Sequence, residues 1–116
     1  MENKTSIIIT SEKLNLQDCY NFVQDASCGG IALFVGTVRN STQNKEVTLL
    51  DFSGYEPMAI KEMQKIADLA LAKFDIQKIA IHHAEGMLQI GAIPVIITAS
   101  AKHRKAAFRA CEFAID

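Results

Sequence analysis

Apolar residues recur along this chain with two different spacings. Short β-branched or continuously apolar runs are typical of strands and predict them over residues 6–10, 31–38, 47–55, 78–84 and 93–99. Apolar residues at i, i+3, i+4 and i+7 form one face of a helix and predict helices over residues 16–25, 57–74 and 100–116. The order β-α-β-β-α-β-β-α predicts an α+β fold with three helices and a mixed or mostly antiparallel sheet.

Several elements carry more detailed predictions. Residues 31–38 are apolar at both alternating sets of positions, which favours a central strand covered on both faces. Asn15 and Ser100 stand where a side chain caps the first and the last helix. The last helix carries a stripe of small residues that predicts close packing on the sheet, with two larger residues beside it. The stripe is Ala107, Ala110, Cys111 and Ala114, and the larger residues are Phe108 and Ile115.

Two adjacent histidines lie in the strand predicted over residues 78–84. Successive side chains of a strand point to opposite faces, so His82 and His83 do not bind one metal ion together. We therefore predict no metal site here and expect one of the two rings to be buried with a hydrogen-bond partner. The segment 86–91 begins and ends with glycine and is predicted to be a loop.

Composition narrows the class of protein. The 116 residues predict one domain over 1–116, and 49% apolar and 22% charged residues indicate a globular chain. A net charge of −1 argues against broad nucleic-acid binding. The first residues lack the plan of a signal peptide, no apolar run is long enough to span a membrane, and three cysteines without metal spacing fit a reducing cytoplasm. No nucleotide-binding loop motif occurs, and no cofactor is predicted.

The strongest chemical signal is a run of cationic residues at the start of the last predicted helix, Lys102–Lys105, which includes His103 and Arg104. Cations lie unfavourably at the positive end of a helix dipole, whereas free N–H groups there bind anions. The pattern fits either a solvated basic turn or an anion site. Arg39, after another strand, is a second candidate. The two strand exits could meet at one edge of the sheet, or across a symmetric dimer, around a phosphorylated or carboxylated ligand.

Three stretches resemble the catalytic (large) subunit of molybdopterin synthase. The first is GGIALFVGTVRN at residues 29–40, and the second is LLDFSGYEPMAIKEMQKIA at residues 49–67. The third begins with HAEGMLQIG and ends with SAKHRKAAFRACEFAID, which is similar to the family pattern S-x-H-R-x-x-A-F-x-A. Together they cover about residues 29–116, in the order and spacing of the family.

The resemblance implies a cytoplasmic sulfurtransferase of molybdenum cofactor biosynthesis with an α/β-hammerhead-like fold. The family converts cyclic pyranopterin monophosphate into molybdopterin, with sulfur from the thiocarboxylated Gly-Gly tail of a small ubiquitin-like carrier subunit. A dimer of large subunits forms the centre of a heterotetramer. By position, Arg39, together with the backbone of Thr37 and Val38, would contact the substrate. His103 and Arg104 would hold its phosphate or the carrier tail, and Arg39 would serve the neighbouring protomer's site.

The chain also departs from the family pattern. The family's catalytic lysines fall beyond the position matching Asp116, so no catalytic residue is assigned within these residues. Ala84 replaces an arginine, and Phe52-Ser53 stands where Tyr-Glu is common. Three interpretations stay open: a piece of a longer enzyme, which we favour, a non-catalytic pterin- or carrier-binding module, or lysines supplied by another chain. A generic anion-binding domain is a weaker alternative.

Overall fold

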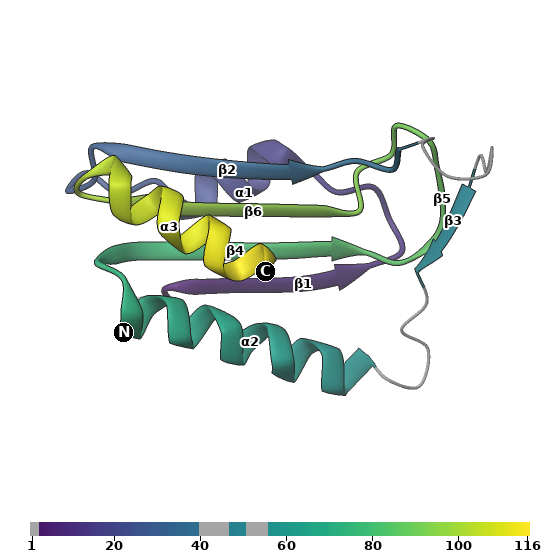
Figure 1. Cartoon of the computed structure of the whole chain (residues 1–116), viewed down its shortest axis with the longest axis horizontal. Helices are drawn as coiled ribbons and strands as arrows, with labels where there is room; N and C mark the ends of the chain where they lie inside the picture. Colours follow the sequence, from purple (N-terminus) through teal and green to yellow (C-terminus); the bar gives the residue numbers. More distant parts are fainter. Residues whose placement is uncertain (1–2, 40–46, 51–55) are drawn as a thin grey trace.

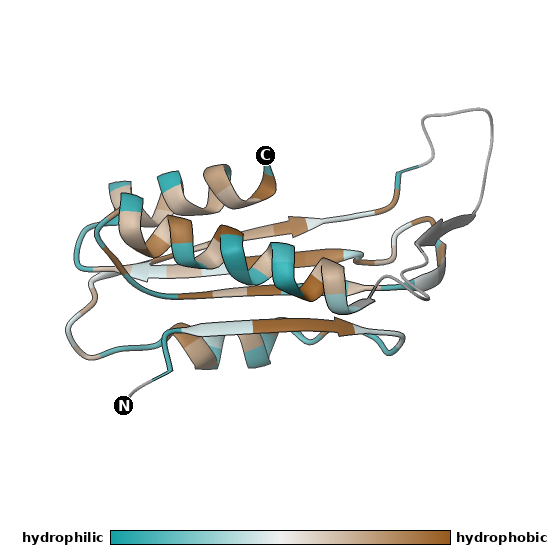
Figure 2. Ribbon diagram, turned by 90° about the horizontal axis from the view of Figure 1, so that it is seen from below, coloured by the Kyte–Doolittle hydropathy of each residue, from teal (hydrophilic) through white to brown (hydrophobic). Residues whose placement is uncertain are grey.

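The computed structural model describes residues 3–39, 47–50 and 56–116, which form a layered α+β structure. A four-stranded sheet has the order β1 (Thr5–Thr10), β4 (Ile76–Ala84), β6 (Val95–Ala101) and β2 (Gly30–Gly36) (Figure 1). Helix α1 (Leu16–Val23) covers one face, and α2 (Glu56–Lys73) and α3 (Arg104–Ile115) cover the other (Figure 2). Strands β3 (Val47–Leu50) and β5 (Gly86–Gln89) form a separate antiparallel pair.

The main sheet is mixed, as predicted. β1 runs parallel to β4, whereas β4 pairs with β6, and β6 with β2, in antiparallel register. Every residue of β6 is buried, because it lies between two strands and under helices on both faces. β6 is therefore the most buried strand of the sheet, one of its two inner strands.

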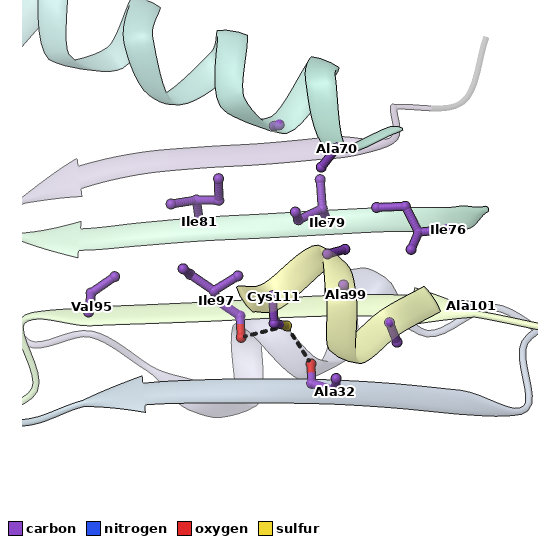
Figure 3. Close-up of a cluster of buried hydrophobic side chains, with 13 residues drawn as sticks. Ala32, Ala70, Ile76, Ile79, Ile81, Val95, Ile97, Ala99, Ala101 and Cys111 are labelled. Atoms are coloured by element: carbon purple, nitrogen blue, oxygen red, sulfur yellow. Dashed lines mark hydrogen bonds between the residues drawn. The ribbon is translucent and has the colours of Figure 1, made fainter. Parts of the chain in front are cut away.

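The larger core lies between the sheet and the helices α2 and α3. Ile79 and Ile97 are fully buried at its centre (Figure 3). Ala107 and Ala110 of α3 are fully buried too, and their small side chains let the helix lie close to β6. The Cys111 thiol donates to the carbonyl oxygen of Ala32 at 3.5 Å (Figure 3). The predicted close packing of this helix is confirmed.

A second core lies under α1, on the opposite face of the sheet. Cys19 and Val23 of α1 are fully buried against Ile96 of β6. The Asn15 Oδ1 atom accepts a hydrogen bond from the Asp18 N–H at 3.1 Å, so the predicted cap of this helix is confirmed. The helix ends at Val23, two residues before the predicted end.

The prediction of a central strand over residues 31–38 is wrong. Within the described residues, β2 is an edge strand that pairs with β6 on one side only. Leu33 is 46% exposed and Phe34 is 37% exposed, which a strand covered on both faces would not allow. A continuous apolar run indicates contact with other apolar groups, but it does not tell whether they belong to the same chain.

Several further predictions need correction. Residues 86–91 are predicted to be a loop, but Gly86–Gln89 form β5, which pairs with β3. The strand predicted over residues 47–55 is observed at Val47–Leu50, and residues 51–55 lie outside the described part. Ser100 does not cap a helix: it is a fully buried residue of β6, and α3 begins at Arg104. Phe108 and Ile115 do not widen the packed stripe, because they are 59% and 40% exposed. Among the described helices, none is long and apolar enough to cross a membrane.

Candidate functional site

The first group of candidate residues follows the end of β2. Backbone hydrogen bonds fix this exit to the turn after β5: the Val38 N–H donates to Ala92 O at 2.9 Å, and the Gly91 N–H donates to Val38 O at 2.8 Å. Gly91 has φ +89°, a conformation that favours glycine. Thr37 and Arg39, on either side of the fixed residue, are exposed to solvent.

The second group lies between β6 and α3. His103 is the residue before the helix and makes no side-chain capping hydrogen bond. The first turn of α3 contains no acidic residue, and the cationic side chains from Lys102 to Lys105 are all exposed. The first turn of α3 therefore lacks an acidic side chain of its own, which a helix start prefers.

Glycine at the start of β2 lets α3 begin close to the sheet. A Cβ atom added to Gly30 would lie 3.0 Å from the Cα atom of Arg104, inside ordinary contact distance. The Gly29 N–H donates to the carbonyl oxygen of Lys102 at 3.2 Å. The Gly-Gly pair thus sets the position of His103 and Arg104, because both glycines contact the turn that carries them.

The two groups of candidate residues lie at opposite ends of the sheet. β2 pairs with β6 from Gly30 opposite Ala101 to Gly36 opposite Val95. Arg39 therefore lies at the end where β6 begins, and His103 lies at the end where β6 finishes. A strand advances about 3.3 Å per residue, so the length of β2 separates the two groups by about 20 Å. The prediction that both exits meet at one edge within a single chain is wrong, and the alternative of a symmetric dimer remains.

A buried polar network lies on the α1 face of the sheet. The His82 Nε2 atom is 2.9 Å from the Ser6 Oγ atom, and its Nδ1 atom is 3.2 Å from the Cys19 Sγ atom. Burial lowers the pKa of His82, although the Asp18 carboxylate acts in the opposite direction. Burial, with a smaller effect of Asp18, raises the pKa of Cys19 to about 11. The pair is a neutral imidazole and a neutral thiol, which suits a structural role and not a nucleophile.

The prediction that one of the two adjacent histidines is buried and bonded is confirmed by His82, which is 6% exposed. Ser6 and Cys19 carried no sequence signal of this contact, since they come from separate elements. Among the described residues, no group of three or more His, Cys, Asp or Glu side chains is placed to hold a metal ion.

Comparison with known proteins identifies the family of this chain. The family model described as MoaE protein matches residues 9–116. The molybdopterin synthase catalytic subunit of Pyrococcus abyssi is 36% identical over 115 residues, which cover 99% of this chain and 78% of that protein. The crystal structure of molybdopterin synthase from Staphylococcus aureus superposes with a TM-score of 0.80 at 31% identity, covering 99% of this chain and 82% of that one.

A more distant structure shows the same fold. It is described as a complex of subunits 1 and 2 of molybdopterin-converting factor from Helicobacter pylori, with a TM-score of 0.71 at 21% identity. The match covers 97% of this chain and 75% of that chain. Because the family model and the Pyrococcus protein both match nearly the whole chain, the chain belongs to the MoaE protein family.

Proposed function

We propose that this chain is the catalytic subunit of a molybdopterin synthase. It would transfer sulfur from a thiocarboxylated carrier protein to cyclic pyranopterin monophosphate and so form the two dithiolene sulfurs of molybdopterin. The observation that carries the proposal is the family match over residues 9–116. The exposed cationic start of α3 agrees with it, because both the precursor and the thiocarboxylate are anions.

The proposed roles follow the chemistry of the exposed side chains. Arg104 and His103 would hold the phosphate of the precursor or the carboxyl end of the carrier tail, since a guanidinium binds two oxygens of such a group at once. Arg39 and Thr37 would contact the substrate from the other group. Val38 already uses its N–H and its carbonyl within the chain, so its contribution would be to hold its two neighbours in place.

We also propose that the complete site forms between two copies of the chain. The outer edge of β2 has no partner strand in the described residues, and its exposed Leu33 and Phe34 offer apolar surface to a neighbour. Antiparallel pairing of two β2 edges about a two-fold axis would bring the end of one β2 beside the start of the other. Arg39 of one copy would then approach Arg104 of its partner, which packs over Gly30.

The remaining parts of the assembly are proposed from the family. A small ubiquitin-like carrier would bind each large subunit, giving a heterotetramer around the central dimer. A structure of similar fold is described as a complex of two subunits, which is consistent with such a partner. The reaction would take place in the cytoplasm, where the three cysteines, all free in the structure, stay reduced. No nucleic acid, membrane or resident cofactor has a role in the proposal.

The test is a sulfur-transfer assay with the thiocarboxylated carrier and the precursor. Formation of molybdopterin would support the proposal, and failure to form product while the precursor still binds would favour a non-catalytic binding module instead. Arg39→Ala and Arg104→Ala should each weaken precursor binding in a calorimetric titration. Unchanged affinity would refute the assigned roles.

Mixing the two variants tests the site between copies. After random exchange of subunits, half of the dimers contain one of each variant, and one of their two sites has both arginines. The mixture should therefore recover about a quarter of the wild-type activity. If both arginines acted in one chain, every site in the mixture would lack one of them and no activity would return.

A further inference from the structure

A cleft lies between the end of α2 and the start of α3. Its volume is about 320 Å³. The residues that line it come from the last turn of α2, the turn that follows, and the first turns of α3. They are Lys73, Phe74, Asp75, His103, Lys105, Ala106 and Arg109.

The lining of this cleft carries more positive than negative charge. Lys73, Lys105 and Arg109 are cations at neutral pH, and Asp75 is the one carboxylate among the lining residues. Within the described part of the chain, neither Lys105 nor Arg109 has an ion-pair partner. The cleft therefore has an excess positive charge that the surrounding described residues do not neutralise.

The arrangement of these cations is unfavourable for the helix that carries them. Lys105 and Arg109 are four residues apart on α3, so their like charges are neighbours and repel each other. Lys105 also lies in the first turn, at the positive end of the helix dipole. A bound anion would reduce both penalties at once.

Lys73 is held beside the cleft by an aromatic contact. Its Nζ atom lies 5.2 Å from the centre of the Phe113 ring, a cation–π distance. Phe113 in turn packs edge-to-face against Phe74, with ring centres 5.7 Å apart. The ammonium group from α2 thereby lies over a ring of α3, although the Lys73 side chain as a whole is exposed.

We propose that this basic cleft is a phosphate-binding site that adjoins His103 and is separate from the contacts assigned to Arg104 and Arg39. Its ligand is a phosphate ester or free phosphate, bound by Lys73, Lys105 and Arg109. The choice of phosphate as the ligand rests on the proposed function, because the proposed substrate carries a phosphate. The excess positive charge of the cleft is independent of the proposed function. A phosphate here would connect α2 to α3 at the point where the candidate site begins.

The test compares two double variants with the same change of charge. Lys105→Gln/Arg109→Gln removes two cations of the cleft, and Lys61→Gln/Lys65→Gln removes two exposed lysines at the same spacing on α2. Inorganic phosphate and ribose 5-phosphate are titrated into the isotope-labelled chain and followed by amide NMR shifts. We expect shifts at Asp75, Lys105 and Ala106 that saturate. The cleft variant should bind about tenfold more weakly, and the control variant should bind like the wild type.

Steady-state sulfur transfer then identifies the source of the phosphate. A raised KM for the precursor in the cleft variant, with kcat unchanged, assigns the site to the phosphate of the substrate and leaves Arg104 to the carrier tail. An unchanged KM with weakened phosphate binding assigns it to free phosphate, and either result supports the site. The inference is overturned if saturating shifts are absent from the cleft, or if the cleft and control variants bind phosphate alike. Because wild-type activity is measured separately, an active enzyme without phosphate at the cleft would refute only this inference.

Discussion

Replacing Gly30 by alanine should move the candidate site without touching any of its side chains. The added Cβ atom would lie 3.0 Å from the Cα atom and 3.2 Å from both the Cβ and the N atom of Arg104. These are mostly backbone atoms, so no flexible side chain can turn away. The contact is about 0.5 Å shorter than the usual separation of carbon atoms, and the start of α3 must move by a similar amount.

The cost of this change follows from the packing of the helix. α3 is anchored by the buried residues Ala107 and Ala110, so its first turn cannot shift freely away from β2. Overpacking of this kind costs about 1–3 kcal/mol. For a chain of this size, the midpoint of thermal unfolding should fall by about 4–12 °C. Displacing the side chains of Arg104 and His103 by a few tenths of an ångström should lower kcat/KM for sulfur transfer about tenfold.

The control is Gly86→Ala. Gly86 has φ +103° with nothing within 4 Å of an added Cβ atom, so alanine there is strained but not crowded. It is the first residue of β5, at the end of the sheet away from the start of α3. We expect a comparable loss of stability with near-normal precursor affinity. If Gly30→Ala keeps both the melting temperature and the precursor affinity of the wild type, the close approach of β2 and α3 does not position the site.

Three further predictions concern the core. Burial lowers the pKa of His82 below 6.5, so the unfolded chain binds more protons than the native chain. The free energy of unfolding should therefore fall as the pH drops from about 6.5. The substitution His82→Asn should make this free energy, measured by urea unfolding at pH 5 and pH 7, depend less on pH. Burial raises the pKa values of Cys19 and Cys111 to about 11. In the native protein, Ellman's reagent at pH 8 should therefore react fast only with the Cys28 thiol. Rapid reaction of all three thiols would contradict the packing. Ile97→Ala should cost about 2–5 kcal/mol in urea unfolding, since the side chain is 1% exposed, and a loss below about 1 kcal/mol would contradict its central place.

Local patterns of the chain were sufficient for most of its elements. The period of apolar residues located α1, α2 and the strands β1, β4 and β6 to within a few residues, because one buried face is enough to set that period. Asn15 was recognised as a cap because it bonds a backbone group only three residues away. The stripe of small residues on α3 predicted close packing for the same reason, since it depends on spacing within one helix.

The tertiary structure decided where those elements lie and therefore where the chemistry lies. A continuous apolar run occurs both in central strands and in edge strands. The position of β2 in the sheet therefore depended on which strands pair in the folded chain. The same pairing placed Arg39 and His103 at opposite ends of one sheet. The packing of α2 and α3 on that sheet placed Lys73 and Lys105 in one cleft. By itself, the sequence determined the residue types of an anion site and the helix and strands that carry them. Their distances depend on contacts between residues far apart in the chain, which no local pattern encodes.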